Sequence, residues 1–302
     1  MNQKVSEKNQ GMVNVVVTYV CWGLLTAFWN LLAKVNPVCV LFQRVVWSAI
    51  FMLIYLLLRH RLNDIIKVFK DKRTMSVCLL SGTLMCLNWG VFIYAVSSGH
   101  VLDSSLGYFI EPIVVTVIGV LFFKERLSKL EKLTIVFSVI GLAYLVFINK
   151  RLPLVSIAIG VTFALYGAVK KNIQLDADMT LFQETITVTP VALLGCILFE
   201  ISGTGAHGIL NGAELLLLPA SGVVTSVPLL FFSRGIKQLP FYLAGIFMYI
   251  NPTIQFLMGV FYFKEPIDIN RVFAFSLIWV GVALTIYHNI GQRKETNGCS
   301  QH

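Results

Sequence analysis

The sequence has few charged residues and few histidines, and both shortages narrow the class of protein. Asp, Glu, Lys and Arg make up 13% of the 302 residues, whereas a typical soluble domain has about 25%. Five histidines stand singly, with no His or Cys partner at metal-ligand spacing; they are His60, His100, His207, His288 and His302. We therefore expect neither a soluble domain nor an enzyme, and no cofactor and no bound metal.

Cysteine pairs of the CxxC type are also absent. The six cysteines mostly fall inside apolar runs, where a thiol packs as a small apolar side chain. We interpret them as packing residues; they are Cys21, Cys39, Cys78, Cys86, Cys196 and Cys299.

Long apolar runs are what the sequence does contain, and hydrophobic residues make up 57% of it. Crossing a bilayer takes about 20 apolar residues in a helix, and backbone groups in lipid must be bonded within their own segment. The runs lack the alternation of a membrane β-strand. The sequence thus predicts an all-α integral membrane protein with ten transmembrane helices in the lipid bilayer, near residues 12–33, 37–58, 75–96, 101–123, 130–148, 152–170, 180–199, 214–235, 240–263 and 271–289.

The basic residues stand in short clusters between these runs. The formal net charge is +9, but no single basic face is formed, so we expect no nucleic-acid partner. Most of the clusters fall on one side of the membrane if the N-terminus is cytoplasmic, which is the usual positive-inside distribution. We therefore predict a multi-pass protein with cytoplasmic tails at both ends, residues 1–11 and 290–302.

An internal repeat runs through the chain. A shift of 140 residues aligns "FIEPIVVTVIGVLFFKE" (109–125) with "YINPTIQFLMGVFYFKE" (249–265) without a gap, and it pairs Gly141 with Gly281. The same shift pairs the "SG" that begins at residue 81 with the "SG" that begins at residue 221.

The repeat divides the chain into two halves, residues 12–148 and 152–289, with five predicted spans each. Because five is odd, the second half must cross the membrane upside down relative to the first. Inverted repeats of this kind are found in many secondary transporters, whose halves rock about a central site. The repeat therefore favours alternating access over a channel.

Motifs spread over nearly the whole chain resemble one family. They are "FQRVVWS" (42–48), "NWGVFIYAV" (88–96), "SLGYFIEP" (105–112), "ETITVTPVALL" (184–194), "VTSVPLLFF" (224–232) and "FYFKEP" (261–266). Together they resemble the drug/metabolite transporter superfamily, whose members carry two five-helix EamA-type repeats, and within it the RarD-like branch. The resemblance implies a transporter or exporter of small organic metabolites or drugs in the inner membrane. The branch usually reads "GYFINP" where this chain has "GYFIEP", so Glu111 departs from its pattern.

Three charged residues fall inside predicted spans and away from their ends: Arg44, Glu111 and Glu184. A charge at the bilayer centre costs about 2.5–3.5 kcal/mol, so such residues usually face a cavity or a partner. From their depths along the helices we predict an ion pair between Arg44 and Glu111, with Glu184 facing the cytoplasmic half of the same cavity. A buried carboxylate suits proton coupling, and Glu184, with no evident cation at its depth, fits that role better. The alternative is that these charges only hold helices together.

Aromatic and amide side chains near these charges are predicted to line the cavity, which would suit small amphipathic substrates. For the aromatic residues, an interfacial belt is the alternative. The predicted lining residues are Trp22, Asn88, Trp89, Tyr108, Tyr166, Tyr249 and Asn251. Pro112 and Pro252 interrupt backbone hydrogen bonding near mid-span, and we interpret them as hinges, with fixed kinks as the alternative.

A small-molecule substrate, and a proton as coupling ion, are thus the expected partners of a secondary transporter. A lipid or lipid-linked flippase on the same fold is the alternative function. No feature of the sequence favours a particular oligomeric state.

Overall fold

The computed structural model describes residues 2–97, 101–150, 154–264, 266–267 and 269–298, and among them there are helices, turns and loops but no strand. Eight helical segments are long and apolar enough to cross a membrane, and two shorter apolar helices, Ile110–Leu121 and Val272–Thr285, coincide with the fourth and tenth predicted spans. The all-α membrane class is confirmed, and the count of ten spans stays a prediction.

The helices follow one another in the order of the predicted spans, with short extra helices between some of them. Their bounds are α1 (Asn2–Leu31), α2 (Pro37–Leu58), α3 (Leu62–Lys70), α4 (Lys72–Ser97), α5 (Val101–Leu121), α6 (Lys129–Asn149), α7 (Leu154–Asn172), α8 (Ala177–Ile201), α9 (Ala206–Ile209), η1 (Gly212–Leu216), α10 (Leu217–Gln238), α11 (Phe241–Phe247), α12 (Ile250–Leu257), η2 (Met258–Tyr262) and α13 (Ile269–Gly298).

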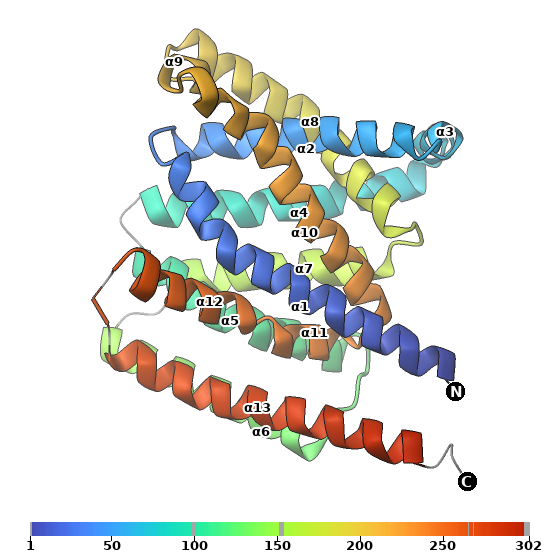
Figure 1. The fold of residues 1–302 in the computed structure, drawn as a ribbon, viewed down its shortest axis with the longest axis vertical. Coiled ribbons are helices and arrows are strands. Elements are labelled where there is room, and N and C mark those ends of the chain that lie inside the picture. The colour runs from blue at the N-terminus through green and yellow to red at the C-terminus, as the bar shows by residue number, and fades with distance from the viewer. Residues whose placement is uncertain (1, 98–100, 151–153, 265, 268, 299–302) are drawn as a thin grey trace.

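Helices from the two halves of the sequence pack against each other throughout the bundle. The main pairs are α1 with α10, α2 with α8 and α10, α4 with α7, α5 with α7, and α6 with α13. Figure 1 shows α6 and α13 side by side at one edge of the molecule, and the start of α1 and the end of α13 on the same side of it. Among the described residues, most of the contacts between helices therefore join one half of the sequence to the other.

Both predicted tails are partly helical. α1 begins at Asn2 and α13 continues to Gly298, although the hydropathy of the sequence places the membrane boundaries near residues 12 and 289. Hydropathy marks where lipid ends, whereas a helix continues for as long as its backbone bonds are formed.

The two prolines predicted as hinges differ in their surroundings. Pro112 lies inside the unbroken helix α5. Pro252 follows a break in the ninth predicted span, because α11 ends at Phe247 and α12 begins at Ile250. The symmetry of the sequence therefore does not extend to the shape of these two helices.

Glycines lie at two of the closest helix crossings, at positions that the shift of 140 pairs. A Cβ atom on Gly82 would lie 2.6 Å from the carbonyl oxygen of Glu184, and one on Gly222 would lie 2.5 Å from the carbonyl oxygen of Trp47. Both distances are too short for a real Cβ contact with backbone, so only glycine allows α4 to cross α8 and α10 to cross α2 this closely.

Gly222→Ala is therefore expected to destabilise the protein by about 1–3 kcal/mol, the usual cost of overpacking. Thermal unfolding in detergent micelles measures the change. Gly90→Ala on α4 is the matched control, because a Cβ there meets nothing within 4 Å and alanine favours a helix over glycine by about 1 kcal/mol. Equal stability of the two variants would contradict the close crossing.

The turn after α5 ties the first half to the start of α11. Lys124 and its repeat equivalent Lys264 both have left-handed backbone conformations, with φ of 53° and 56°. Next to Lys124, the Glu125 carboxylate accepts hydrogen bonds from the backbone N–H groups of Phe241 (2.6 Å) and Tyr242 (2.9 Å). A side chain of the first half thus caps a helix of the second half, where an anion interacts favourably with the helix N-terminus.

Candidate functional site

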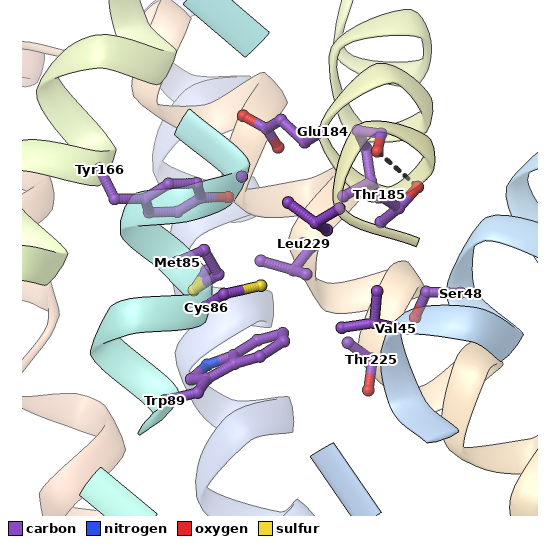
Figure 2. Close-up of a pocket in the computed structure, with 13 residues that line it drawn as sticks. Val45, Ser48, Met85, Cys86, Trp89, Tyr166, Glu184, Thr185, Thr225 and Leu229 are labelled. Carbon is purple, nitrogen blue, oxygen red and sulfur yellow. Dashed lines mark hydrogen bonds between the residues drawn. The ribbon is translucent and has the colours of Figure 1, made fainter. Parts of the chain in front are cut away.

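A pocket lies between helices of both halves of the chain (Figure 2). Its cavity has a volume of about 30 Å³, room for about one water molecule and well below the 300–1,000 Å³ typical of ligand sites, so an organic ligand fits only if the surrounding helices move apart. The lining residues come from α2, α4, α7, α8 and α10: Val45, Ser48, Gly82, Met85, Cys86, Trp89, Tyr166, Leu181, Glu184, Thr185, Val188, Thr225 and Leu229. Figure 2 shows Glu184 and Tyr166 at one end, Trp89 at the other, and Met85 and Cys86 between them.

Glu184 forms a buried ion pair with Lys170 of α7. The Lys170 side chain is fully buried and that of Glu184 is 4% exposed. Ser81 donates a hydrogen bond of 2.5 Å to the other carboxylate oxygen, and Tyr166 lies at the same end of the pocket (Figure 2). The prediction that Glu184 has no cation at its depth is therefore wrong.

Lys170 was missed because it stands next to Lys171 at the end of a predicted span, where two lysines look like a cytoplasmic cluster. Successive residues on a helix point about 100° apart, so the two side chains cannot leave the membrane in the same direction. Lys171 turns to the end of α10, where its ammonium donates to the carbonyl oxygens of Ile236 (2.8 Å) and Leu239. Adjacency of the two lysines was the available signal that one of them faces inward.

Arg44 flanks the opposite end of the pocket. Its guanidinium lies 4.2 Å from the ring centre of Trp29 and 4.1 Å from that of Trp89, and its Nε donates to the Thr225 hydroxyl at 3.2 Å. The guanidinium thus lies over two indole rings, an arrangement that cation–π attraction stabilises.

The predicted ion pair between Arg44 and Glu111 is wrong, because the described ion pairs do not include it. Glu111 is buried and lies near Asn88, whose side-chain nitrogen donates to the Ile159 carbonyl at 2.8 Å. These residues lie where α4 and α5 pack on α7, and neither Glu111 nor Asn88 lines the pocket. Their contacts favour the alternative in which the charge holds helices together.

Among the other residues predicted to line the cavity, Trp89 and Tyr166 do so. Trp22 instead packs on Phe163 and Phe232, with ring centres 5.9 and 5.5 Å away. The aromatic cluster lies next to the pocket, because Tyr166 also stacks on Phe232.

Tyr249 and Asn251 lie away from the described pocket. Tyr249 is buried in an apolar cluster with Leu145 and Phe275, and the Asn251 side chain accepts a hydrogen bond of 3.1 Å from Gln255. The side chain of Tyr108 lies outside the described residues. Neither Tyr249 nor Asn251 is therefore part of the described pocket.

Ion pairs hold the start of α8, the helix that carries Glu184. Arg61 donates to both oxygens of Asp176, at 2.9 and 2.7 Å, and Arg234 pairs with Asp178 at 2.6 Å. Partial burial alone would raise the pKa of Asp176, but hydrogen bonds from Arg61 and from backbone N–H groups outweigh it and hold that pKa below its ordinary value. Arg61 and Arg234, which the sequence analysis interprets as topology signals, thus also bind the acidic start of α8.

Comparison with known proteins places the chain among transporters. The family described as "EamA-like transporter family" matches residues 9–147. The uncharacterized transporter YojE of Bacillus subtilis (strain 168) is 34% identical over 290 residues, which cover 94% of this chain and 96% of that protein. Protein RarD of Salmonella typhi is 33% identical over 292 residues, covering 96% of this chain and 99% of its own length.

A solved crystal structure has the same fold. It superposes with a TM-score of 0.71 and covers 92% of this chain and 96% of its own, at 16% sequence identity. At this identity the likeness is evidence of fold alone.

Proposed function

The chain belongs to the EamA-like transporter family, in its RarD-like branch, and from this premise we propose that it is a secondary transporter that carries small organic molecules through the pocket of Figure 2. It is a multi-pass membrane protein, and transport by alternating access between two inverted halves, in an inner membrane with both termini cytoplasmic, is part of the proposal. The observation that carries it is the pocket itself, whose walls come from both halves and which holds a buried ion pair at one end.

Contacts between α6 and α13 support the inverted repeat. A Cβ on Gly141 would lie 3.2 Å from the Ala274 carbonyl oxygen, and one on Gly281 would lie 2.9 Å from the Cα of Thr134. The shift of 140 residues exchanges these two contacts, since it pairs Gly141 with Gly281 and Thr134 with Ala274. Reciprocal contacts of this kind are expected across a two-fold axis. The start of α1 and the end of α13 on one side of the molecule (Figure 1) agree with an even number of spans.

Glu184 is the proposed proton carrier. When the carboxylate is ionised it attracts Lys170 and holds α8 to α7; when it takes a proton this attraction is lost, and the two helices are free to separate. Proton occupancy is thereby linked to the shape of the pocket, which is what coupling requires. The described groups that face Glu184 from neighbouring helices are Lys170, Tyr166, Ser81, Cys78 and Lys237.

Alternating access is tested with Cys86, which lines the pocket. We would keep Cys86 as the only cysteine, reconstitute the chain in vesicles, and add a membrane-impermeant maleimide from either side. We expect labelling from both sides, with a ratio that changes when a pH gradient is applied. A chain that keeps only Cys39, which is fully buried, is the control and should react slowly from both sides.

Labelling of Cys86 from one side only, under every gradient, would contradict alternating access. In the same vesicles a fluorescent lipid tests the flippase alternative. Movement of this lipid between the two leaflets, at the rate at which Cys86 changes from access on one side to access on the other, would favour a lipid substrate.

A further inference from the structure

The short helix α3 lies at the end of the bundle, between two helices that are long and apolar enough to cross a membrane. Those helices are Pro37–Leu58 and Lys72–Tyr94, and α3 occupies Leu62–Lys70 between them. Figure 1 shows α3 at the end of α2 and nearly along its own axis, so it runs across the direction of α2. It lies on the same side of the molecule as the start of α1 and the end of α13. A helix in this position lies along the membrane surface, at the level of the lipid headgroups.

Two apolar faces run side by side along α3. One packs on the protein, since Ile65 and Val68 are buried. The other, the exposed apolar face, consists of Leu62, Ile66 and Phe69, which follow one another at helical spacing and are 43–52% exposed. Three large apolar side chains in a row are unfavourable in water, and at the membrane surface acyl chains cover them.

Contacts with α8 hold α3 in this orientation. The ring of Phe69 lies edge to face against that of Phe182 on α8, with the ring centres 6.4 Å apart. Arg61, directly before α3, donates to Asp64 at 2.9 Å and also to both oxygens of Asp176 at the start of α8. The faces of α3 therefore point in defined directions.

The segment that contains α3 is strongly basic, and its two acidic side chains are already engaged. Residues 59–73 contain six Lys or Arg and two Asp. Asp64 pairs with Arg61. Asp71 accepts hydrogen bonds from the backbone N–H groups of Arg73 (3.1 Å) and Thr74 (3.4 Å), and so caps the start of α4. Neither carboxylate therefore neutralises the lysines of this segment.

Three exposed lysines of this segment form what we call the lysine cluster: Lys67, Lys70 and Lys72. The ion pairs among the described residues do not include them. At about 100° per residue, Lys67 and Lys70 lie on the side of α3 opposite its buried face and next to its exposed apolar face. A positive charge beside an apolar surface is thus offered to a partner from outside the chain.

We propose that α3 binds anionic phospholipids of the leaflet on the side of the two termini. Their acyl chains cover the exposed apolar face, and their phosphate headgroups bind the lysine cluster. A phosphate and an acyl chain in one molecule match a basic face that borders an apolar one, whereas a soluble anion matches the basic face alone. The inference concerns the lipid around the protein, and it goes beyond what the pocket carries.

Quenching of a fluorophore on α3 by spin-labelled lipids measures which lipid lies against it. Ile66→Cys, as the only cysteine of the full chain, is labelled with bimane in phosphatidylcholine nanodiscs that contain spin-labelled phosphatidylglycerol or spin-labelled phosphatidylcholine. We expect phosphatidylglycerol to reach half-maximal quenching at a fraction at least about fivefold lower, the effect of one basic residue near an anionic lipid. Replacing the three lysines of the cluster by Gln should abolish this preference and leave equal quenching by both lipids, which shows that α3 still lies against lipid.

The matched control removes the same charge elsewhere. Lys124→Gln, Lys129→Gln and Lys132→Gln together change three exposed lysines after α5 and at the start of α6, and should leave the preference unchanged. Excess inorganic phosphate should also leave it unchanged, relative to chloride at the same ionic strength, because phosphate has no acyl chain. Equal quenching by both lipids in the unaltered lysine background, or no quenching by either, would overturn the inference. So would a preference that survives loss of the lysine cluster, one that the control variant lacks, or one that inorganic phosphate removes.

Discussion

Lys170→Met is expected to lower the free energy of unfolding by about 3–5 kcal/mol, because it removes one partner of a buried ion pair and leaves the other charge uncompensated. The Lys170 side chain is fully buried, and Glu184 has only 4% of its side chain exposed, so water cannot replace the lost cation. Reversible unfolding in mixed micelles, followed by circular dichroism, measures the difference.

Replacing both partners together should recover most of this loss. In the Lys170→Met, Glu184→Leu variant no charge remains buried, and substituting a buried pair by apolar residues of similar volume is often neutral or stabilising. Lys34→Met is the matched control, because Lys34 pairs with Glu214 with 66% and 40% of their side chains exposed, and exposed pairs contribute about 0–1 kcal/mol. A loss at Lys170 no larger than the loss at Lys34 would show that the pair is not buried in the membrane.

Glu184→Gln is expected to remove the effect of a pH gradient on the ratio of Cys86 labelling from the two sides of the membrane. Glutamine has nearly the shape of glutamate but cannot take up or release a proton, so the gradient can no longer change the conformation of the pocket. Labelling from both sides without a gradient requires no net proton movement and should persist. Both measurements use the same vesicle preparation, so persistent two-sided labelling also shows that the variant is folded.

Glu111→Gln is the control for this experiment, since it makes the same chemical change at a second buried glutamate of the membrane interior. Glu111 lies near Asn88 and does not line the pocket, so the gradient should still change the labelling ratio. Loss of the gradient effect in Glu111→Gln with a normal effect in Glu184→Gln would show that the proposal assigns the proton to the wrong carboxylate. Should Glu184→Gln fold poorly, the Lys170→Met, Glu184→Leu variant provides the second test, with the same expected loss of the gradient effect.

The membrane class and the helices could be predicted from the sequence, because apolar runs and their charged ends follow from the energetics of a helix in lipid. Part of the site could be predicted for the same reason. An ionised side chain in a membrane must have a partner, and this argument selects Glu184 and Arg44, which lie at the two ends of the pocket.

Partners could not be predicted, because depth along a helix says nothing of the direction in which a side chain points. Arg44 and Glu111 have similar depths, yet Glu111 lies near Asn88, while Arg44 lies over two indole rings. The rotation of each helix is set by packing between segments far apart in the sequence, such as the crossing of Gly82 over Glu184. The role of Lys170 could not be predicted for a further reason. A basic residue near the end of a span is equally compatible with a topology signal and with a buried counter-ion.

The Glu125 carboxylate binds backbone N–H groups of residues 241 and 242, and not their side chains. Every amino acid except proline carries that donor, so the two accepting hydrogen bonds are independent of which side chains occupy these positions. The contact therefore requires a particular side chain at only one position, Glu125 in the first half. Residues 241 and 242 could change in related proteins while the contact persisted, and a comparison of paired substitutions across the two halves would not detect it.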